Sequence, residues 1–271
     1  MTTSSPLLGV RVSVDYPGKP GVLRNISLDL EPGEILGLVG ESGSGKSTIA
    51  LTILGLLPLK GGKVQGQVVF KDEDLLAKRE KELRRLRGRD ISIVLQSPLT
   101  SLNPVLRIGT QLKEAWRSHA NGSAAVCLEA IQAAFTSVCL PSDKNFLRRR
   151  PSQLSLGQAQ RVIIAMAILH RPSLLIADEP TSALDTITQA EILKLLARLN
   201  RELNMAILYI SHDLLSLATL CHRIAILYEG QIVESGSPNQ IFAAPRHEYT
   251  RRLVAALPKQ PDVVAQDLVS V

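Results

Sequence analysis

A glycine-rich octapeptide constrains this chain more than any other feature. Residues Gly40–Ser47 read GESGSGKS and lie between an apolar run at Ile35–Val39 and a helix-like run at Ile49–Leu57. Glycines let the backbone turn with its N–H groups pointing inward, Lys46 supplies a positive charge for the β- and γ-phosphates, and the Ser47 hydroxyl can ligate Mg²⁺. A flexible Gly/Ser loop with an exposed lysine is the alternative, and the flanking strand and helix patterns disfavour it. We therefore predict an α/β protein with a nucleotide-phosphate site.

Length and composition predict a globular chain. The 271 residues are 45% hydrophobic and can bury a core as one large domain or two lobes. The longest uncharged segment, Ile91–Leu106, is interrupted by polar residues and prolines, so it does not supply the ~20 apolar residues of a bilayer span. Residues Met1–Val10 lack the pattern of a secretory signal, which favours a cytoplasmic protein. The three cysteines are widely spaced and indicate neither a disulfide framework nor a metal site.

The net charge of +6 raises the question of nucleic-acid binding. Lys78–Arg89 and Arg148–Arg150 are locally basic, but Glu80 and Glu82 interleave with leucines in the pattern of an amphipathic surface helix. Aromatic residues make up only 3% of the chain, too few for a base-stacking platform. We therefore expect no nucleic-acid partner. A basic face would equally suit a protein lying against an anionic inner leaflet.

Apolar periodicity divides the chain into strands and helices. Val10, Val12 and Val14 alternate as in a strand, and the turn at residues 31–34 predicts a hairpin from a strand at Ile26–Leu30 into the strand before the phosphate loop. Further strands are expected at Gln65–Phe70, Ile91–Leu95, Leu174–Ala177, Ala206–Ile210 and Arg223–Leu227, and helices within Ile108–Leu140 and at Gly157–His170, Thr188–Leu203 and Leu214–Leu220. Pro141–Gln153 reads as a polar connector, and residues 228–231 as a hairpin turn.

Polar residues at the ends of several predicted strands indicate nucleotide chemistry. The strand at residues 174–177 runs into Asp178 and Glu179, which suit a Mg²⁺ ligand and a group that holds a water against the γ-phosphate. Gln96 and His212 end two other strands, and strand ends of a parallel sheet converge on the ligand crevice. A helix-capping role for the two carboxylates and structural roles for the glutamine and the histidine are the alternatives.

Together these motifs resemble those of an ATP-binding cassette (ABC) ATPase, over nearly the whole chain. Leu154–Gln158 is similar to the family's signature motif, Ser182–Asp185 to its D-loop, Gln96 to its Q-loop, His212 to its switch histidine and Tyr16 to its adenine-stacking aromatic residue. The resemblance implies a P-loop NTPase fold with a RecA-like core, an antiparallel β subdomain and a helical subdomain.

Three segments resemble subunits of dipeptide, oligopeptide and nickel importers, namely Gln96–Pro104, Ala177–Asp185 and Pro245–Thr250. Two features depart from the family's pattern. Leu156 stands where the signature usually has glycine, and the C-terminal region lacks the cysteine cluster of some relatives. The resemblance implies an ATPase subunit that drives import of peptides, nickel or a related small solute. Alternatives are a soluble ABC ATPase and a nucleotide-binding regulatory module without turnover.

The resemblance also implies a role for each site residue. Two cassettes enclose two ATP molecules, and the phosphate loop of one subunit faces the signature of the other. The implied catalytic residues are Lys46, Gln96, Glu179 and His212, and the implied Mg²⁺ ligands are Ser47, Gln96 and Asp178. The implied ATP ligands are Tyr16, Gly40, Glu41, Ser42, Gly43, Ser44, Gly45, Lys46, Ser47 and Thr48, with Ser155, Gly157 and Gln158 serving the opposite site.

Partners and domain limits follow from the same resemblance. A second ABC ATPase subunit, two transmembrane permease subunits and, indirectly, an extracytoplasmic solute-binding protein are implied, with this chain peripheral on the cytoplasmic face of the membrane. Ser97–Pro104 is expected to belong to the docking surface for a membrane subunit. Residues 7–258 are predicted to form one domain, with a core at 7–96 and 160–258, a helical subdomain at 97–159 and a loose tail at 259–271.

Overall fold

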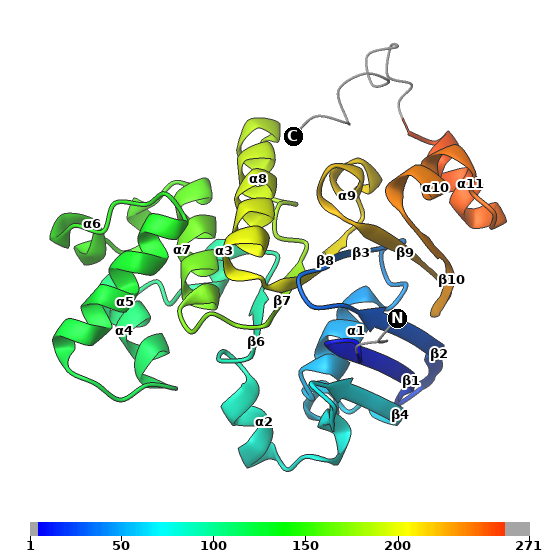
Figure 1. Cartoon of the computed structure of the whole chain (residues 1–271), viewed down its shortest axis with the longest axis horizontal. Helices are drawn as coiled ribbons and strands as arrows, with labels where there is room; N and C mark the ends of the chain where they lie inside the picture. Colours follow the sequence, from blue (N-terminus) through cyan, green and yellow to red (C-terminus); the bar gives the residue numbers. More distant parts are fainter. Residues whose placement is uncertain (1–4, 258–271) are drawn as a thin grey trace.

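The structure, a computed structural model, describes residues 5–257 and contains two β-sheets with helices around them (Figure 1). The four-stranded sheet has the order β2-β1-β4-β5 and the six-stranded sheet has the order β10-β9-β3-β8-β7-β6. The strands are β1 (Leu8–Tyr16), β2 (Lys19–Leu30), β3 (Ile35–Val39), β4 (Lys63–Phe70), β5 (Glu73–Asp74), β6 (Ile91–Val94), β7 (Leu174–Asp178), β8 (Ala206–Ser211), β9 (Arg223–Tyr228) and β10 (Gln231–Gly236).

The central strands of the larger sheet are parallel and buried. β3 pairs in parallel with β8 and β9, β7 with β6 and β8, and only β10 runs antiparallel to its neighbour. All five residues of β3 and all six of β8 are buried, as is typical of parallel strands covered on both faces. Their carboxyl ends lie at one edge of the sheet, where Asp178 ends β7, Gln96 follows β6 and the glycine-rich loop follows β3.

The smaller sheet is antiparallel and corrects one prediction. The turn at residues 31–34 does not form a hairpin, because β2 pairs with β1 whereas β3 lies in the other sheet between β8 and β9. The amide of Glu34 donates to the carbonyl oxygen of Glu31 at 3.1 Å, so a local turn is present, but it carries the chain from one sheet to the other. β2 has a partly exposed face, as is typical of an antiparallel sheet, whereas β3 is buried throughout, as is typical of a parallel one. The two strands therefore belong to different sheets.

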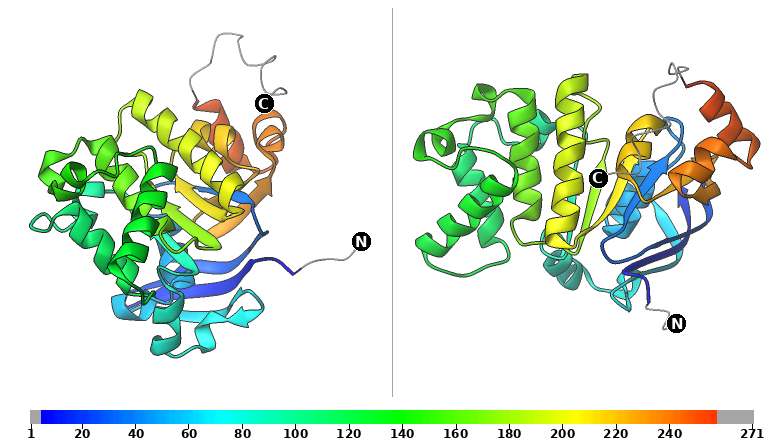
Figure 2. Two further views of the ribbon diagram at one scale, coloured as in Figure 1. Left: turned by 60° about the vertical axis from the view of Figure 1, so that its left-hand side comes forward. Right: turned by 45° about the horizontal axis from the view of Figure 1, so that its top comes forward.

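The helices gather into a group beside the larger sheet and a layer against its faces (Figures 1 and 2). Helices α4 to α7 form the group, drawn in green. The helices are α1 (Lys46–Ile53), α2 (Glu80–Leu86), α3 (Pro98–Ser101), α4 (Ile108–Arg117), α5 (Ala124–Ser137), α6 (Lys144–Arg148), α7 (Leu156–Ile168), α8 (Thr186–Leu203), α9 (Leu214–Leu220), α10 (Pro238–Ala243) and α11 (Glu248–Ala255), with 3₁₀ turns η1 (Leu57–Lys60), η2 (Leu75–Ala77) and η3 (Pro151–Gln153).

The predicted connector at residues 141–153 is another correction, since it contains α6 and η3. The Asp143 side chain caps α6 by accepting from the amides of Asn145 and Phe146. Phe146 is buried and its ring meets that of Phe135 edge to face, 5.8 Å between centroids. One buried aromatic residue and one cap therefore order a segment that has no long apolar period.

Two hydrophobic clusters form the core of the described residues. One joins the larger sheet to the helical group through α7, and the other joins it to the antiparallel sheet through α1. Helix α7 is continuous across the boundary predicted between residues 159 and 160. The predicted domain limits stay a prediction, and the tail at 259–271 lies outside the described residues. None of the helices in residues 5–257 is long and apolar enough to cross a membrane.

Candidate functional site

The glycine-rich loop joins β3 to α1. Gly45 caps α1 with φ of 110°, a conformation in which a side chain is strained, and an added Cβ would lie 2.6 Å from Cδ2 of Leu23. No side chain caps this helix, so its first N–H groups are available to an anion. The loop and the helix N-terminus together therefore provide donors for phosphate oxygens.

Lys46 is the first residue of α1, and its side chain contacts the start of this loop. Its side chain is 6% exposed, and Nζ donates to the carbonyl oxygens of Gly40 at 2.7 Å and Glu41 at 2.9 Å. Burial lowers the pKa of Lys46 from its ordinary value, and the nearby charges of Glu179 and Asp178 act in the opposite direction. A bound phosphate would also favour the charged lysine, so the loop is suited to an anionic ligand.

Asp178 ends β7 and lines the same cavity as Ser47. Burial raises the pKa of the Asp178 carboxyl, while the Ser47 hydroxyl and the charge of Lys46 lower it. A carboxylate and a hydroxyl are hard oxygen donors of the kind that Mg²⁺ prefers. The pair therefore fits the predicted metal role, and a divalent cation would stabilise the ionised carboxylate.

Glu179 follows Asp178 and has the left-handed backbone conformation, with φ of 49°. This conformation is uncommon for a residue other than glycine and is held by the bond from its amide to the carbonyl oxygen of Ile210, 2.9 Å long. Both of its carboxylate oxygens have a partner. Nε2 of Gln96 donates to Oε2 at 3.1 Å, and Nδ1 of His212 lies 3.3 Å from Oε1. Three predicted catalytic residues therefore meet at one carboxylate.

One cavity of about 490 Å³ collects most of the predicted ligands. It is lined by Tyr16, Lys19, Val22, Ser42, Gly43, Gly45, Lys46, Ser47, Thr48, Gln96, Asp178 and Glu179. His212 lines an adjoining hollow of about 240 Å³ that shares Glu179. Lys19 and Val22 near the start of β2 were not predicted from the sequence. The one sequence feature that links them to the site is their closeness to Tyr16 in the chain, and this feature did not indicate that β2 approaches the loop.

The signature segment lines neither hollow. Ser155 caps α7 by accepting from the Gln158 amide at 3.2 Å, and the Gln158 side chain accepts from the Ser155 amide at 3.2 Å. Gly157 lies against α8, since an added Cβ would be 2.8 Å from Cγ2 of Thr188. Leu156 is half-buried at the first position of α7. The structure thus separates these residues from the cavity of the same chain.

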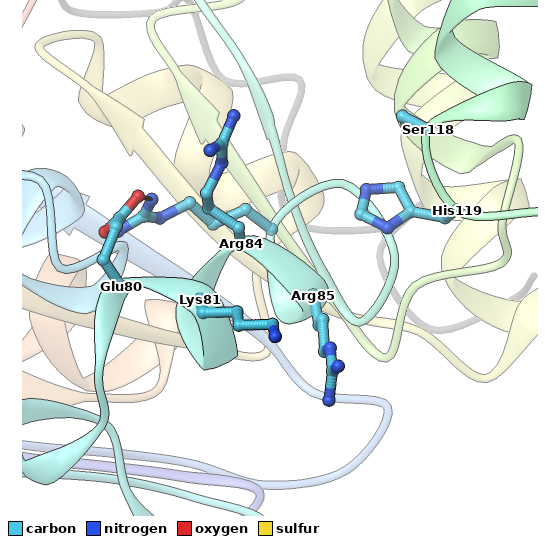
Figure 3. A pocket seen from close by; sticks show the side chains of 7 residues that line it. Glu80, Lys81, Arg84, Arg85, Ser118 and His119 are labelled. Atoms are coloured by element: carbon cyan, nitrogen blue, oxygen red, sulfur yellow. Dashed lines mark hydrogen bonds and ion pairs between the residues drawn. The ribbon is translucent and has the colours of Figure 1, made fainter.

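A larger hollow of about 810 Å³ lies between α2 and the end of α4 (Figure 3). Its lining combines the basic side chains of α2 with Ser118 and His119, which face α2 from the helical group. Glu80 is paired with Arg87, whose Nη1 lies 2.7 Å from Oε1. Lys81, Arg84 and Arg85 have no ion-pair partner among residues 5–257, so the cleft has an excess of positive charge.

Comparison with known proteins gives consistent results. The sequence pattern of the ABC transporter family matches residues 23–182, more than half of the chain. Glutathione import ATP-binding protein GsiA of Escherichia coli K12 is 43% identical over 252 residues, which cover 89% of this chain and 40% of that protein. The chain therefore spans about two fifths of the length of the curated relatives it matches.

Solved structures show the same fold. The structure of cbiO1 from Clostridium perfringens, part of the transporter complex cbiONQ, has a TM-score of 0.78 at 25% identity and covers 94% of this chain and 97% of that chain. The ATP-binding cassette MJ0796, in a dimeric post-hydrolysis state with ADP and Pi, has a TM-score of 0.72 at 26% identity and covers 85% of this chain and 98% of that chain. The fold is that of an ATP-binding cassette, and the chain belongs to the ABC transporter family.

Proposed function

We propose that this chain binds and hydrolyses ATP as the nucleotide-binding part of an ABC importer. The observation that carries the proposal is the convergence of Lys46, Asp178, Glu179 and Gln96 on one cavity at the carboxyl edge of the parallel sheet. They come from three strand ends: Lys46 follows β3, Gln96 follows β6, and the two carboxylates stand at the end of β7. Strand ends of this kind form the ligand crevices of α/β proteins.

The chemistry follows from the contacts of these side chains. The loop amides and Lys46 would bind the β- and γ-phosphates, and Tyr16 at the rim of the cavity would stack on adenine. Glu179 would orient the attacking water and accept its proton. Gln96 and His212 already contact the Glu179 carboxylate, so both can hold it in position and respond to the γ-phosphate.

Ser47, Asp178 and Gln96 are the proposed residues for a magnesium ion. Mg²⁺ is usually held by one or two carboxylates together with water and substrate phosphates, and the Asp178 carboxylate and Ser47 hydroxyl in one cavity fit that donor set. Gln96 lines the same cavity and would supply an amide oxygen. The ion would neutralise charge on the phosphates during transfer.

A second cassette is proposed to complete each site. Ser155, Gly157 and Gln158 lie outside the cavity of their own chain, so they are free to face the nucleotide of a partner. The relative MJ0796 is described as dimeric. ATP would then bridge two subunits and favour their closed arrangement, and hydrolysis would remove the bridge. The partner is a second copy or a different ABC subunit.

The proposed cargo is a peptide or a related small solute. The curated relatives are named as glutathione import proteins. These names favour a role in transport over that of a soluble ABC ATPase, and they also favour a peptide-like cargo. Nickel, which the sequence resemblance also implies, is the alternative cargo. We propose two permease subunits as direct partners and an extracytoplasmic solute-binding protein as an indirect one, with this chain peripheral on the cytoplasmic face. The unpaired basic side chains of α2 in Figure 3 suit a position beside anionic headgroups.

Nucleotide titration tests the proposal. A fluorescent ATP analogue should bind the purified protein with Mg²⁺, and Lys46→Ala should weaken binding by about tenfold or more, because charge-assisted hydrogen bonds to phosphate are lost. Lys60→Ala is the matched control, since Lys60 is exposed at the end of η1 and does not line the cavity. Equal affinities of the two variants would overturn the proposed site.

A further inference from the structure

His212 lies between two residues whose positions are fixed by hydrogen bonds. Ser211 before it ends β8 and is buried, and its hydroxyl accepts from the amide of Asp213 at 3.0 Å. Asp213 after it caps α9, since its Oδ1 accepts from the amide of Leu215 at 3.0 Å. The backbone of His212 is therefore set by the end of a strand and the start of a helix. In this position Nδ1 of the ring lies 3.3 Å from Oε1 of Glu179.

The other carboxylate oxygen of Asp213 is bound from a different helix. Nε2 of Gln189 in α8 donates to Oδ2 of Asp213 at 3.1 Å and to Oγ of Ser216 at 2.9 Å. Ser216 belongs to α9, is 4% exposed, and donates its own hydroxyl hydrogen to the same Oδ2. Among residues 5–257, Gln189 provides the side-chain hydrogen bonds that join the first turn of α9 to α8.

The side chain of Gln189 belongs to the surroundings of the histidine. Gln189 is half-buried and lines the hollow of about 240 Å³ beside the nucleotide cavity, and so do Asp213, His212 and Glu179. It does not line the nucleotide cavity itself. The start of α8 does not depend on this side chain, because the carboxylate of Asp185 caps the helix. The Gln189 amide therefore serves α9 and the hollow rather than its own helix.

We propose that Gln189 is a positioning residue of the ATPase site, which acts through Asp213 to hold His212 against Glu179. This inference rests on the proposed function, to which it adds a residue that touches no nucleotide. The His212 side chain is 60% exposed, so its ring is held by its own backbone and by the Glu179 carboxylate rather than by close packing. A displacement of about 1 Å in such a group can cost up to about 10²-fold in rate. The bond from Gln189 therefore affects turnover and not nucleotide affinity.

A carboxylate at position 189 tests the proposal with almost no change in shape. Gln189→Glu removes the amide that donates to Asp213 and places a second negative charge beside it. We expect kcat for phosphate release by the assembled cassette, with Mg²⁺ and ATP, to fall about five- to thirtyfold. A fluorescent ATP analogue should bind within about twofold of the parent. Gln132→Glu is the matched control and should equal the parent, because Gln132 is exposed in α5 and lines neither the nucleotide cavity nor the hollow beside it.

The swapped pair Gln189→Glu with Asp213→Asn separates positioning from packing. In this double variant the amide and the carboxylate exchange places, so the bond between the two side chains forms again, and asparagine caps a helix about as well as aspartate does. The kcat should return to within about threefold of the parent. A double variant as slow as Gln189→Glu would overturn the inference, and so would a loss of analogue binding as large as the loss of kcat.

The same measurements distinguish this inference from the proposed function. If the parent protein itself neither binds the analogue nor releases phosphate, the proposed function fails. If the parent is active and Gln189→Glu keeps the parental kcat, the inference alone fails.

Discussion

At the scale of single residues, Leu156 is the main departure from the family's signature. A glycine is required where the backbone has positive φ or where a Cβ would clash. Leu156 is outside the set of residues with positive φ and begins a regular helix, half-buried. Its neighbours Ser155 and Gln158 form a reciprocal capping box. The loop is thus fixed by hydrogen bonds that do not depend on the side chain at position 156.

Leu156→Gly is therefore expected to leave ATPase activity within about threefold of the parent. The measurement is steady-state phosphate release with saturating Mg²⁺ and ATP. A gain of about tenfold, worth ~1.4 kcal/mol in the barrier, would contradict this view and would indicate that Leu156 weakens the half-site of an asymmetric heterodimer.

Glu179 shows how local strain can be part of a site. Its left-handed backbone turns the carboxylate toward Gln96 and His212, and a bond from its amide to β8 holds the conformation. Such outliers cost of order 1–3 kcal/mol each and persist only where the surroundings fix them. The apolar pattern of β7 predicted the strand and its terminal carboxylates, but no sequence pattern indicated this backbone conformation.

At the scale of elements, the contact of α7 with α8 depends on Gly157. An added Cβ would lie 2.8 Å from Cγ2 of Thr188, which is closer than real Cβ contacts allow. The Thr188 hydroxyl is bound to Asp185 at 2.7 Å, and its amide is bound to the same carboxylate at 2.9 Å, so the side chain cannot turn away without loss of this cap. The two helix N-termini therefore approach closely only if position 157 lacks a side chain.

Gly157→Ala should lower the free energy of unfolding by about 1–3 kcal/mol, the usual range for overpacking. Urea denaturation of the single variant checks this. Thr188→Ser removes the methyl group and keeps the hydroxyl, so it should restore most of the loss when combined with Gly157→Ala. A double variant no more stable than Gly157→Ala would show that the contact with Thr188 is not the cause.

Elements with a clear apolar period could be predicted from the sequence. The helices near residues 188–203 and 214–220 and the strands of the parallel sheet lie close to their predicted limits. The prediction of a hairpin into β3 was wrong, because strand pairing is decided by burial in the complete fold. Helix α6 was missed because it depends on one cap and one buried ring. Lys19 and Val22 were missed because their place in the cavity is a tertiary contact.

In the whole molecule, a candidate docking surface lies directly after the carboxyl edge of the larger sheet. Gln96 follows β6 and touches Glu179, and the chain continues into the short helix α3. Leu99 in α3 is 45% exposed, whereas Leu102 is buried at 2%. Movement at Gln96 could therefore be transmitted to a membrane partner through an exposed apolar residue, and Leu102 belongs to the core instead.

Cross-linking tests this surface. In a Cys139→Ser background, which removes the exposed native thiol, Leu99→Cys should form an adduct with an integral membrane protein in native membranes. Leu59→Cys is the matched control, because Leu59 is also exposed and apolar but lies in η1. Adducts at the same low level from both positions would count against docking at α3.

We propose that Glu179 holds the reacting water when the assembled cassette hydrolyses ATP. This is tested by phosphate release with Mg²⁺ and ATP by the parent, by Glu179→Gln and by the control Glu202→Gln. Glu202 is exposed in α8 and lines neither hollow. We expect Glu179→Gln to lower the rate by about 10²- to 10⁴-fold, because the amide cannot accept the proton, and to leave binding of a fluorescent ATP analogue within about threefold of the parent. Glu202→Gln should match the parent. Phosphate release by Glu179→Gln at the parent rate would show that Glu179 is not the residue that activates the water.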